Sequence, residues 1–555
     1  MREKYWWLTE ESKSMLERGY LLPNQTVEDK LNSICKHAAS FYKDEEGLKE
    51  RFLELFERGW CSLSSPIWAN FGEERGLPIS CFSSFISDSM EGIYSSLYEV
   101  AMETKLGGGT SGYFGKLRPI GSPIKGGGVS SGLMSFVELF DTTTKVVSQA
   151  GVRRGAFAAY VDIDHPEIEK FLTVKDKQSE LQSINNAVCV SDEWMKSMED
   201  GDKEKREIWA KVLKSRREKG IPYIFFSDTV NKNKPQIYKD TNSTIHSSNL
   251  CLEIFLPTSE SESFVCCLMS MNLATYYEWK DTDAVKLAVM FLDAVMSDFI
   301  KKVKDIPSMY RTYNFAKRHR ALGLGVMGWH SLLQQKMIPF ESFGAQQLNT
   351  QIFKYLKEES YKSSVELGEK YGYAPIFEEV ETSDVKRRNT TLLALAPTTS
   401  SSSILGQVSP SIEPYASNYF VAGLAKGSFT RKNFELEKLL ESKGKNTEDV
   451  WKGIIQNQGS VQHLDFLSQE EKDVFKTFQE ISPLTVIQQA SARQAFIDQG
   501  QSLNLKIPSA MSIKDINKIH MESWKLGLKG LYYQRGTSVA KEAVLEMMEC
   551  KSCEA

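Results

Sequence analysis

Asn249, Cys251 and Glu253 occupy alternate positions of one short segment, so that an amide, a thiol and a carboxylate are spaced two residues apart. If the segment is extended, alternate side chains point to the same side of the backbone. The thiol, flanked by a hydrogen-bonding amide and an acid/base carboxylate, would then face one small substrate. The spacing therefore predicts an active site at residues 249–253.

Further cysteines could carry redox chemistry. Cys81 follows a Leu-Pro-Ile-Ser segment, Cys266 and Cys267 are adjacent, and Cys550 and Cys553 form a CxxC pair near the end of the chain. The chain has nine cysteines, an odd number, and its first residues lack the charged-then-apolar pattern of an export signal. We therefore expect reduced thiols in a cytoplasmic protein, in which a disulfide would be catalytic. For Cys81 and Cys266 taken alone, a buried structural cysteine is the alternative.

Composition argues against several classes of protein. With 41% hydrophobic and 25% charged residues, the chain is typical of a globular protein, and no apolar run reaches the length of a membrane span. A net charge of −4 and a pI near 6.1 argue against a basic nucleic-acid-binding surface. The seven histidines are scattered and one CxxC pair stands alone, so no metal site is predicted. We expect neither a nucleic acid nor a membrane as partner.

Turn residues and short apolar runs indicate the elements that must position these groups. Between about 64 and 165, Gly- and Ser-rich turns alternate with short apolar runs. Strands are predicted at 221–226, 390–396 and 529–534, and a long amphipathic helix is predicted at 284–303. Because strand and helix signals alternate along the chain, an α/β fold is favoured.

A polar segment follows the predicted strand at 390–396. Its central residues are Thr399, Ser400 and Ser401, and it is expected to open a helix. Main-chain N–H groups and hydroxyls at a helix start form a suitable site for a diphosphate. An ordinary Ser/Thr helix cap is the alternative. A nucleotide thus remains a candidate ligand of this acidic chain.

The order of these motifs resembles the catalytic large subunit of class I ribonucleotide reductases, over most of the chain from about Ser64 onward. The resemblance implies a ten-stranded α/β barrel with Cys251 on a finger loop inside it. It divides the chain into a helical N-terminal region at 1–63, a barrel with active and specificity sites at 64–538, and a mobile redox-active tail at 539–555. Residues 1–63 are too few for the ATP-cone of many such subunits, so no cone is expected.

The resemblance also implies a role for each group of the active site. Removing H3′ as a hydrogen atom lets the 2′-hydroxyl of a ribonucleotide leave as water. A thiyl radical at Cys251 would remove this hydrogen atom and later return it. Glu253 would accept the proton of the 3′-hydroxyl, and Asn249 would orient the ribose. Cys81 and Cys266 would supply two electrons and become a disulfide.

One assignment in the reducing pair stays open, because Cys267 is adjacent to Cys266. The spacing Cys-x-Leu-x-x-x-Asn-Leu, as in the family, favours Cys266. A terminal pair such as Cys550 and Cys553 would reduce the disulfide by thiol–disulfide exchange. That pair would itself be reduced by thioredoxin or glutaredoxin.

Tyr532 and Tyr533 match a pair that, in class I enzymes, relays an oxidising equivalent from a small subunit. The resemblance implies that this subunit holds the metal cofactor and that no cofactor is bound covalently to this chain. An adenosylcobalamin-dependent (class II) reductase is an alternative of the same fold, and it does not need the pair. A thiol–disulfide oxidoreductase that uses the terminal CxxC, with the barrel as a nucleotide-binding regulator, is an alternative of another class. It gives no role to Asn249, Glu253 or the tyrosines.

Two sets of ligand contacts also follow from the resemblance. Ribonucleoside diphosphate substrates would contact Ser65, Ser80, Gly108, Gly109, Asn249, Glu253, Thr399, Ser400 and Ser401. A deoxynucleoside triphosphate or ATP effector, with Mg²⁺, would bind a specificity site at Asp88, Ser89, Met90, Arg118 and Lys125. The loop with Arg153 and Arg154 would carry the effector signal to the substrate, and the effector-bound chain is expected to form a homodimer.

Overall fold

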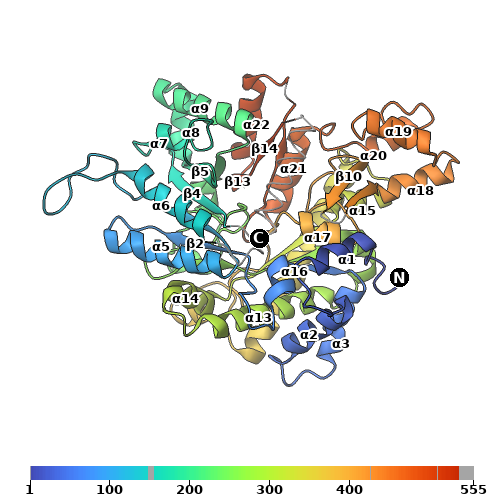
Figure 1. Ribbon diagram of the computed structural model, residues 1–555, viewed down its shortest axis with the longest axis horizontal. Coiled ribbons are helices and arrows are strands. Elements are labelled where there is room, and N and C mark those ends of the chain that lie inside the picture. Colours follow the sequence, from blue (N-terminus) through green and yellow to red (C-terminus); the bar gives the residue numbers. More distant parts are fainter. Residues whose placement is uncertain (1, 148–154, 425–426, 509, 537–555) are drawn as a thin grey trace.

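The computed structural model describes residues 2–147, 155–424, 427–508 and 510–536, without the side chains of residues 420–430. Helices surround a central ring of strands, and the N-terminal helices lie against one side of it (Figure 1). Among the described helices, none is both long enough and apolar enough to cross a membrane.

Three helices form the N-terminal region: α1 (Glu10–Glu17), α2 (Val27–Ala39) and α3 (Leu48–Glu57). The apolar stripe of α3 is buried, and the ring of Phe52 packs edge-on against Phe291 with centroids 5.4 Å apart. The region therefore shares one hydrophobic core with the rest of the chain. It is helical, as the sequence predicts.

One half of the central ring consists of five strands that run parallel to one another. In the order of their pairing they are β2 (Cys81–Phe85), β3 (Gly109–Tyr113), β4 (Phe157–Asp162), β5 (Ile184–Val190) and β6 (Tyr223–Phe226). Nearly all their residues are buried, as is usual for parallel strands whose outer face is covered by helices.

The other half begins with a strand that is broken at one residue. β7 (Phe264–Cys266) continues into β8 (Leu268–Asn272), and β8 pairs in parallel with β9 (Gly323–Met327). A short strand, β1 (Cys61–Leu63), pairs antiparallel with β8 on its other side.

Two less regular segments complete this half. Isolated parallel bridges join the segment 390–396 to β9 and also to the segment 499–503. β12 (Leu505–Lys506) continues the second segment and pairs in parallel with β14 (Gln534–Arg535). The sequence predicts a regular strand at 390–396, whereas the structure has an extended segment with single bridges.

Antiparallel pairs join the two halves at both edges. β2 pairs with β7, and β13 (Gly530–Leu531), which leads into β14, pairs with β6. The second half thus has five strands as well: β7 with β8, β9, the segment 390–396, the segment 499–506, and β13 with β14. β1 is not counted, and the ring closes with five strands on each side. This confirms the predicted ten-stranded α/β barrel.

Helices connect the strands and cover the outside of the barrel (Figure 1). The predicted helix at 284–303 is α13 (Ala284–Val303), which packs against α16 (Phe343–Tyr371). The others are α4 (Ser65–Asn70), α5 (Met90–Lys105), α6 (Leu133–Val146), α7 (Ile168–Phe171), α8 (Asp192–Asp200), α9 (Lys203–Lys219), α10 (Ser227–Lys232), α11 (Gln236–Asp240), α12 (Tyr276–Trp279), α14 (Tyr310–His319), α15 (Trp329–Gln335), α17 (Thr399–Ile404), α21 (Pro483–Gln494) and α22 (Ile513–Lys525).

A small lobe extends from the barrel beside α15 (Figure 1). It contains the hairpin of β10 (Tyr419–Leu424) and β11 (Gly427–Lys432), and the helices α18 (Phe434–Ser442), α19 (Glu448–Gln456) and α20 (Gln469–Val474). The three helices and their connections have an apolar cluster of their own, separate from the main core.

Candidate active site

The segment between α11 and β7 crosses the interior of the barrel. From one half of the barrel, Tyr160 OH on β4 donates a hydrogen bond to Asn249 O, at 2.7 Å. From the other half, the Gly500 amide donates to Glu253 O, at 2.8 Å. Cys251 lies between these two anchors and is 6% exposed. It is therefore carried by a finger loop that both halves of the barrel hold.

The tip of this loop is a turn, so the condition of an extended segment, under which all three side chains would share one side, is not met. Leu252 has a φ of +61°, and its amide donates to Asn249 O, at 3.3 Å. Asn249 Oδ1 accepts from the amides of Glu253 and Ile254, at 3.1 Å each, because buried backbone groups need partners. Cys251 and Glu253 line the cavity, whereas Asn249 lies behind them. Its Nδ2 is buried and makes no hydrogen bond to any described residue.

Glu253 is placed for proton exchange near neutral pH. Burial, together with the neighbouring Cys81, raises the pKa of its carboxyl from 4.5 to about 8. Ser502 Oγ lies 3.0 Å from Glu253 Oε2 and 2.6 Å from Cys251 O. A protonated Glu253 can therefore donate to Ser502 while Ser502 donates to Cys251 O. The acid and the backbone of the thiol residue share one hydrogen-bond chain.

Two of the predicted thiols lie opposite each other on neighbouring strands. Cys81 on β2 is in register with Cys266 on β7, and Cys81 lines the same cavity as Cys251. Burial, reinforced by the Cys81 thiol, raises the pKa of Cys266. Cys267 points outward instead, and its Sγ donates to Leu292 O on α13, at 3.4 Å. Since side chains alternate along a strand, this arrangement favours Cys266 over Cys267 as the partner of Cys81.

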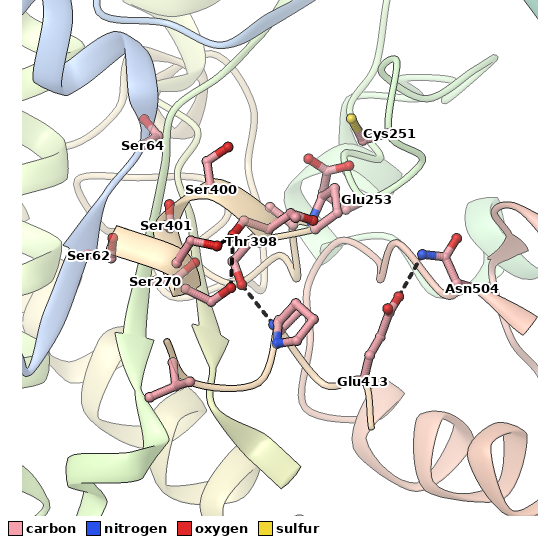
Figure 2. A pocket seen from close by; sticks show the side chains of 18 of the residues that line it. Ser62, Ser64, Cys251, Glu253, Ser270, Thr398, Ser400, Ser401, Glu413 and Asn504 are labelled. Carbon is pink, nitrogen blue, oxygen red and sulfur yellow. Dashed lines mark hydrogen bonds between the residues drawn. The ribbon is translucent and has the colours of Figure 1, made fainter. Parts of the chain in front are cut away.

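A wall rich in hydroxyl groups forms another side of the cavity, which has a volume of about 250 Å³ (Figure 2). α17 begins three residues after the segment 390–396, and Thr399, Ser400 and Ser401 line the cavity. Ser401 Oγ lies 3.4 Å from Leu63 O. The polar segment thus opens a helix, as the sequence predicts, and its side chains face the same space as the finger loop.

Of the other predicted substrate contacts, the two serines line the cavity and the two glycines do not. Ser65 and Ser80 line the cavity, but Gly108 and Gly109 are not part of its wall. A Cβ at Gly108 would lie 2.2 Å from the ring of Phe82, and one at Gly109 would lie 2.9 Å from the finger loop. Packing within the barrel is one reason for both glycines, and the close approach to a nucleotide that the resemblance implies stays a prediction.

The two tyrosines pack against each other at the edge of the cavity. Tyr532 lines it and is 2% exposed, whereas Tyr533 does not line it and is 6% exposed. Their ring centroids are 4.3 Å apart, with an angle of 58° between the planes. Tyr223 on β6 completes an aromatic cluster, with centroids 4.7 Å from Tyr532 and 5.0 Å from Tyr533.

Several polar residues of the cavity wall are absent from the sequence predictions. Among them are Ser62, Ser64, Ser270, Thr398, Gln407, Glu413, Arg431, Asn504, Lys506 and Arg535. Figure 2 shows Glu413 and Asn504 apart from the serines, joined by a hydrogen bond of 2.7 Å. Ser502, Asn504 and Lys506 alternate with leucines, and this strand pattern is a signal that could have identified their edge of the cavity.

The predicted specificity site lies elsewhere, at the start of α5. Arg118 Nε is 2.7 Å from Asp88 Oδ2, and Ser89 caps α5. Met90 is 55% exposed and Lys125 is also exposed. None of these five residues lines the described cavity.

Four predicted positions cannot be compared with the structure. Arg153, Arg154, Cys550 and Cys553 lie outside the described residues. Within the described ranges, no group of three or more His, Cys, Asp or Glu side chains is arranged to hold a metal ion.

Known proteins share both the sequence and the fold. The family of the ribonucleotide reductase barrel domain matches residues 79–205, 203–388 and 386–534. The ribonucleoside-diphosphate reductase large subunit of Invertebrate iridescent virus 3 is 32% identical, over 90% of this chain and 90% of its own length. The large subunit of Danio rerio is 31% identical, over 94% of this chain and 74% of its own.

A solved structure extends the likeness to three dimensions. The class Id ribonucleotide reductase alpha subunit of Actinobacillus ureae superposes with a TM-score of 0.92 and 49% sequence identity, covering 99% of this chain and 100% of that one. The chain therefore belongs to the ribonucleotide reductase family, as a large subunit of the class I type.

Proposed function

We propose that this chain reduces ribonucleoside diphosphates to 2′-deoxyribonucleoside diphosphates by radical chemistry, supplying precursors of DNA. One arrangement carries the proposal: Cys251 and Glu253 at the tip of the finger loop, Cys81 on β2 and the hydroxyls of α17 all face a single cavity. A hydrogen-atom carrier, an acid/base group, a reductant and a site for phosphates are the parts that this reaction needs.

In the proposed reaction, a thiyl radical at Cys251 removes H3′ as a hydrogen atom, so that a C–H bond breaks and an S–H bond forms. Glu253 accepts the proton of the 3′-hydroxyl, and the protonated 2′-hydroxyl leaves as water. Cys81 protonates the departing 2′-hydroxyl, and together Cys81 and Cys266 supply two electrons and two protons and become a disulfide. Glu253 returns its proton to the 3′-oxygen, after which Cys251 returns its hydrogen atom to C3′. One ribonucleoside diphosphate and one dithiol thus give one deoxyribonucleoside diphosphate, one disulfide and one water.

Asn249 is proposed to orient the ribose in this reaction. Its Oδ1 is committed to the backbone of the loop, which fixes the side chain in one position. The amide hydrogens of Nδ2 keep their capacity to donate, since they make no hydrogen bond to the described residues. Because Asn249 is buried and does not line the cavity, its contact with a ribose hydroxyl would require the finger loop to shift when substrate binds.

The radical is proposed to originate in a separate small subunit whose metal cofactor supplies the oxidising equivalent. Tyr533 packs on Tyr532, and Tyr532 lines the cavity, so the pair supports a relay towards Cys251. Cys550 and Cys553 would then reduce the disulfide of the barrel by thiol–disulfide exchange, and thioredoxin or glutaredoxin would reduce that pair in turn.

A deoxynucleoside triphosphate or ATP, with Mg²⁺, is proposed to select the substrate from the start of α5. The contacts of this effector would be Asp88, Ser89, Met90, Arg118 and Lys125. Because Arg118 is paired with Asp88, a triphosphate would have to compete with that carboxylate. Arg153 and Arg154 would carry the signal to the substrate.

The effector-bound chain is proposed to form a homodimer through α5. Met90, Tyr94 and Tyr98 recur every four residues along this helix, so they lie on one face. All three side chains are at least half exposed, at 55%, 50% and 59%. An apolar face of this kind is typical of a surface that another protein covers.

A direct assay distinguishes this function from its alternatives. The chain is mixed with its small subunit, thioredoxin and each ribonucleoside diphosphate, and the deoxynucleotides formed are measured. We expect turnover that requires the small subunit and is unaffected by adenosylcobalamin. Turnover with adenosylcobalamin and no second subunit would instead support a class II enzyme, which the class I structural relative does not favour.

A further inference from the structure

The hydroxyl of Tyr533 is held by a side chain of the barrel wall. Asn185 lies on β5, is 6% exposed, and donates a hydrogen bond from Nδ2 to Tyr533 OH, at 3.1 Å. On its other side, Lys175 Nζ donates to Asn185 Oδ1. An amide thus connects an ammonium group to the phenol.

Lys175 decides which way this amide points. An ammonium group has donors and no acceptor, so the group that faces Lys175 must be the carbonyl oxygen, Oδ1. The NH₂ group of Asn185 then faces Tyr533, and the phenol oxygen is the acceptor. The amide is therefore fixed in one orientation, and it presents a donor polarised by a nearby positive charge.

We propose that Asn185, oriented by Lys175, is a positioning residue for Tyr533. This inference rests on the proposed relay through the two tyrosines. Asn185 does not line the cavity, so it acts through the phenol and not on the substrate. It holds the polar end of a ring whose centroid lies 4.3 Å from that of Tyr532. It also directs the phenol's own proton away from the amide.

The contact has an electrostatic signature that a purely structural role would lack. A hydrogen bond donated to the phenol oxygen stabilises the phenolate over the phenol, and so does a nearby cation. Loss of the Asn185 amide should therefore raise the pKa of the phenol at position 533. A carboxylate at position 185 should raise it further, because it accepts from the phenol and repels the phenolate.

The first experiment measures this pKa in the full chain, with 3-nitrotyrosine placed at position 533 as an absorbance probe. We expect the pKa of the probe to rise by about one unit in Asn185→Leu, and by more in Asn185→Asp. Asn186→Leu is the matched control, because Asn186 is the next buried amide of β5 and donates to Phe171 O instead, at 3.0 Å. The control should leave the pKa of the probe unchanged.

The second experiment uses the native Tyr533 and the complete enzyme with its small subunit. We expect Asn185→Leu to lower kcat by at least about tenfold at unchanged KM, as misplacement of a reacting group does. Tyr533→Phe, in the same assay, tests the relay by itself. Melting temperatures of Asn185→Leu and Asn186→Leu compare the structural effect of losing either amide. Lys175→Gln is a further variant, which removes the charge beside Asn185 but keeps the Asn185 amide in the barrel wall.

The outcomes separate this inference from the function on which it rests. A raised pKa with a lowered kcat supports the positioning role. An unchanged pKa in both Asn185 variants overturns it, and so does a normal kcat in Asn185→Leu when Tyr533→Phe is inactive. Full activity of Tyr533→Phe would instead overturn the relay itself.

Discussion

Replacing the carboxyl of the finger loop is expected to stabilise the protein at alkaline pH while it abolishes turnover. In the folded protein the pKa of Glu253 is raised from 4.5 to about 8, by burial and then by Cys81. In the unfolded chain the pKa returns to its ordinary value, so the folded state binds one more proton between these two pH values. The stability from this group is therefore fully present below about pH 4.5 and is lost as the pH rises through about 8.

The shift in pKa sets the magnitude. One pKa unit corresponds to about 1.4 kcal/mol, so Glu253 should lower the free energy of unfolding by about 3–4 kcal/mol between pH 5 and pH 8. The amide of a Glu253→Gln variant does not titrate, so the variant does not lose this free energy of unfolding as the pH rises. The stability of the variant relative to that of the wild type should therefore increase as the pH rises.

Thermal unfolding of the wild type and of Glu253→Gln at pH 5, 6, 7 and 8 measures the effect. Melting temperatures are compared pairwise, because a chain of this size need not unfold in two states. Glu381→Gln, at an exposed position, controls for the removal of one negative charge. A difference in melting temperature between wild type and Glu253→Gln that stays constant from pH 5 to pH 8 would refute a raised pKa at this carboxyl.

Three further predictions concern the path of the electrons. Cys266→Ser is expected to abolish a single turnover of the pre-reduced enzyme. Cys267→Ser should retain that turnover, because the thiol of Cys267 faces α13. Activity in Cys266→Ser would contradict the pairing of Cys266 with Cys81. Tyr532→Phe should silence turnover at a cost of about 1 kcal/mol of stability or less, and wild-type activity would argue against the relay. Changing both Cys550 and Cys553 to Ser should stop repeated turnover with thioredoxin but leave one turnover in a rapid-quench assay. Normal cycling of that variant would exclude the tail as the reductant.

The ten-stranded barrel was expected from the resemblance to a known family, whereas α13 and the orientation of the two adjacent thiols follow from local signals. A twenty-residue amphipathic pattern predicts α13 with its observed bounds. The spacing of Cys266 from the Asn-Leu that follows favours it over Cys267, and the strand places those two thiols on opposite faces. These features depend on neighbours in the chain, which a sequence displays.

The shape of the finger loop was not predictable from the same kind of signal. Leu250 and Leu252 alternate with polar residues as they would in a strand, yet Leu252 has a positive φ and the segment turns. None of the described strands pairs with the tip of the loop, so the Asn249 side chain accepts from the amides of Glu253 and Ile254 instead. The pKa of Glu253 likewise depends on burial and on Cys81, which raise it, and on Ser502, which lowers it; both residues are distant in the chain.

The most direct test of a radical at the finger loop is the Cys251→Ser variant, assayed with the small subunit on all four ribonucleoside diphosphates. We expect no deoxynucleotide from any substrate, because the O–H bond of an alcohol is too strong for serine to replace the thiol as a hydrogen-atom carrier. Equilibrium binding of substrate and effector should stay near that of the wild type. Cys189→Ser, which changes a buried thiol that faces His246 O at 3.7 Å, is the control and should stay active. Substantial deoxynucleotide formation by Cys251→Ser would contradict a thiyl radical at this residue.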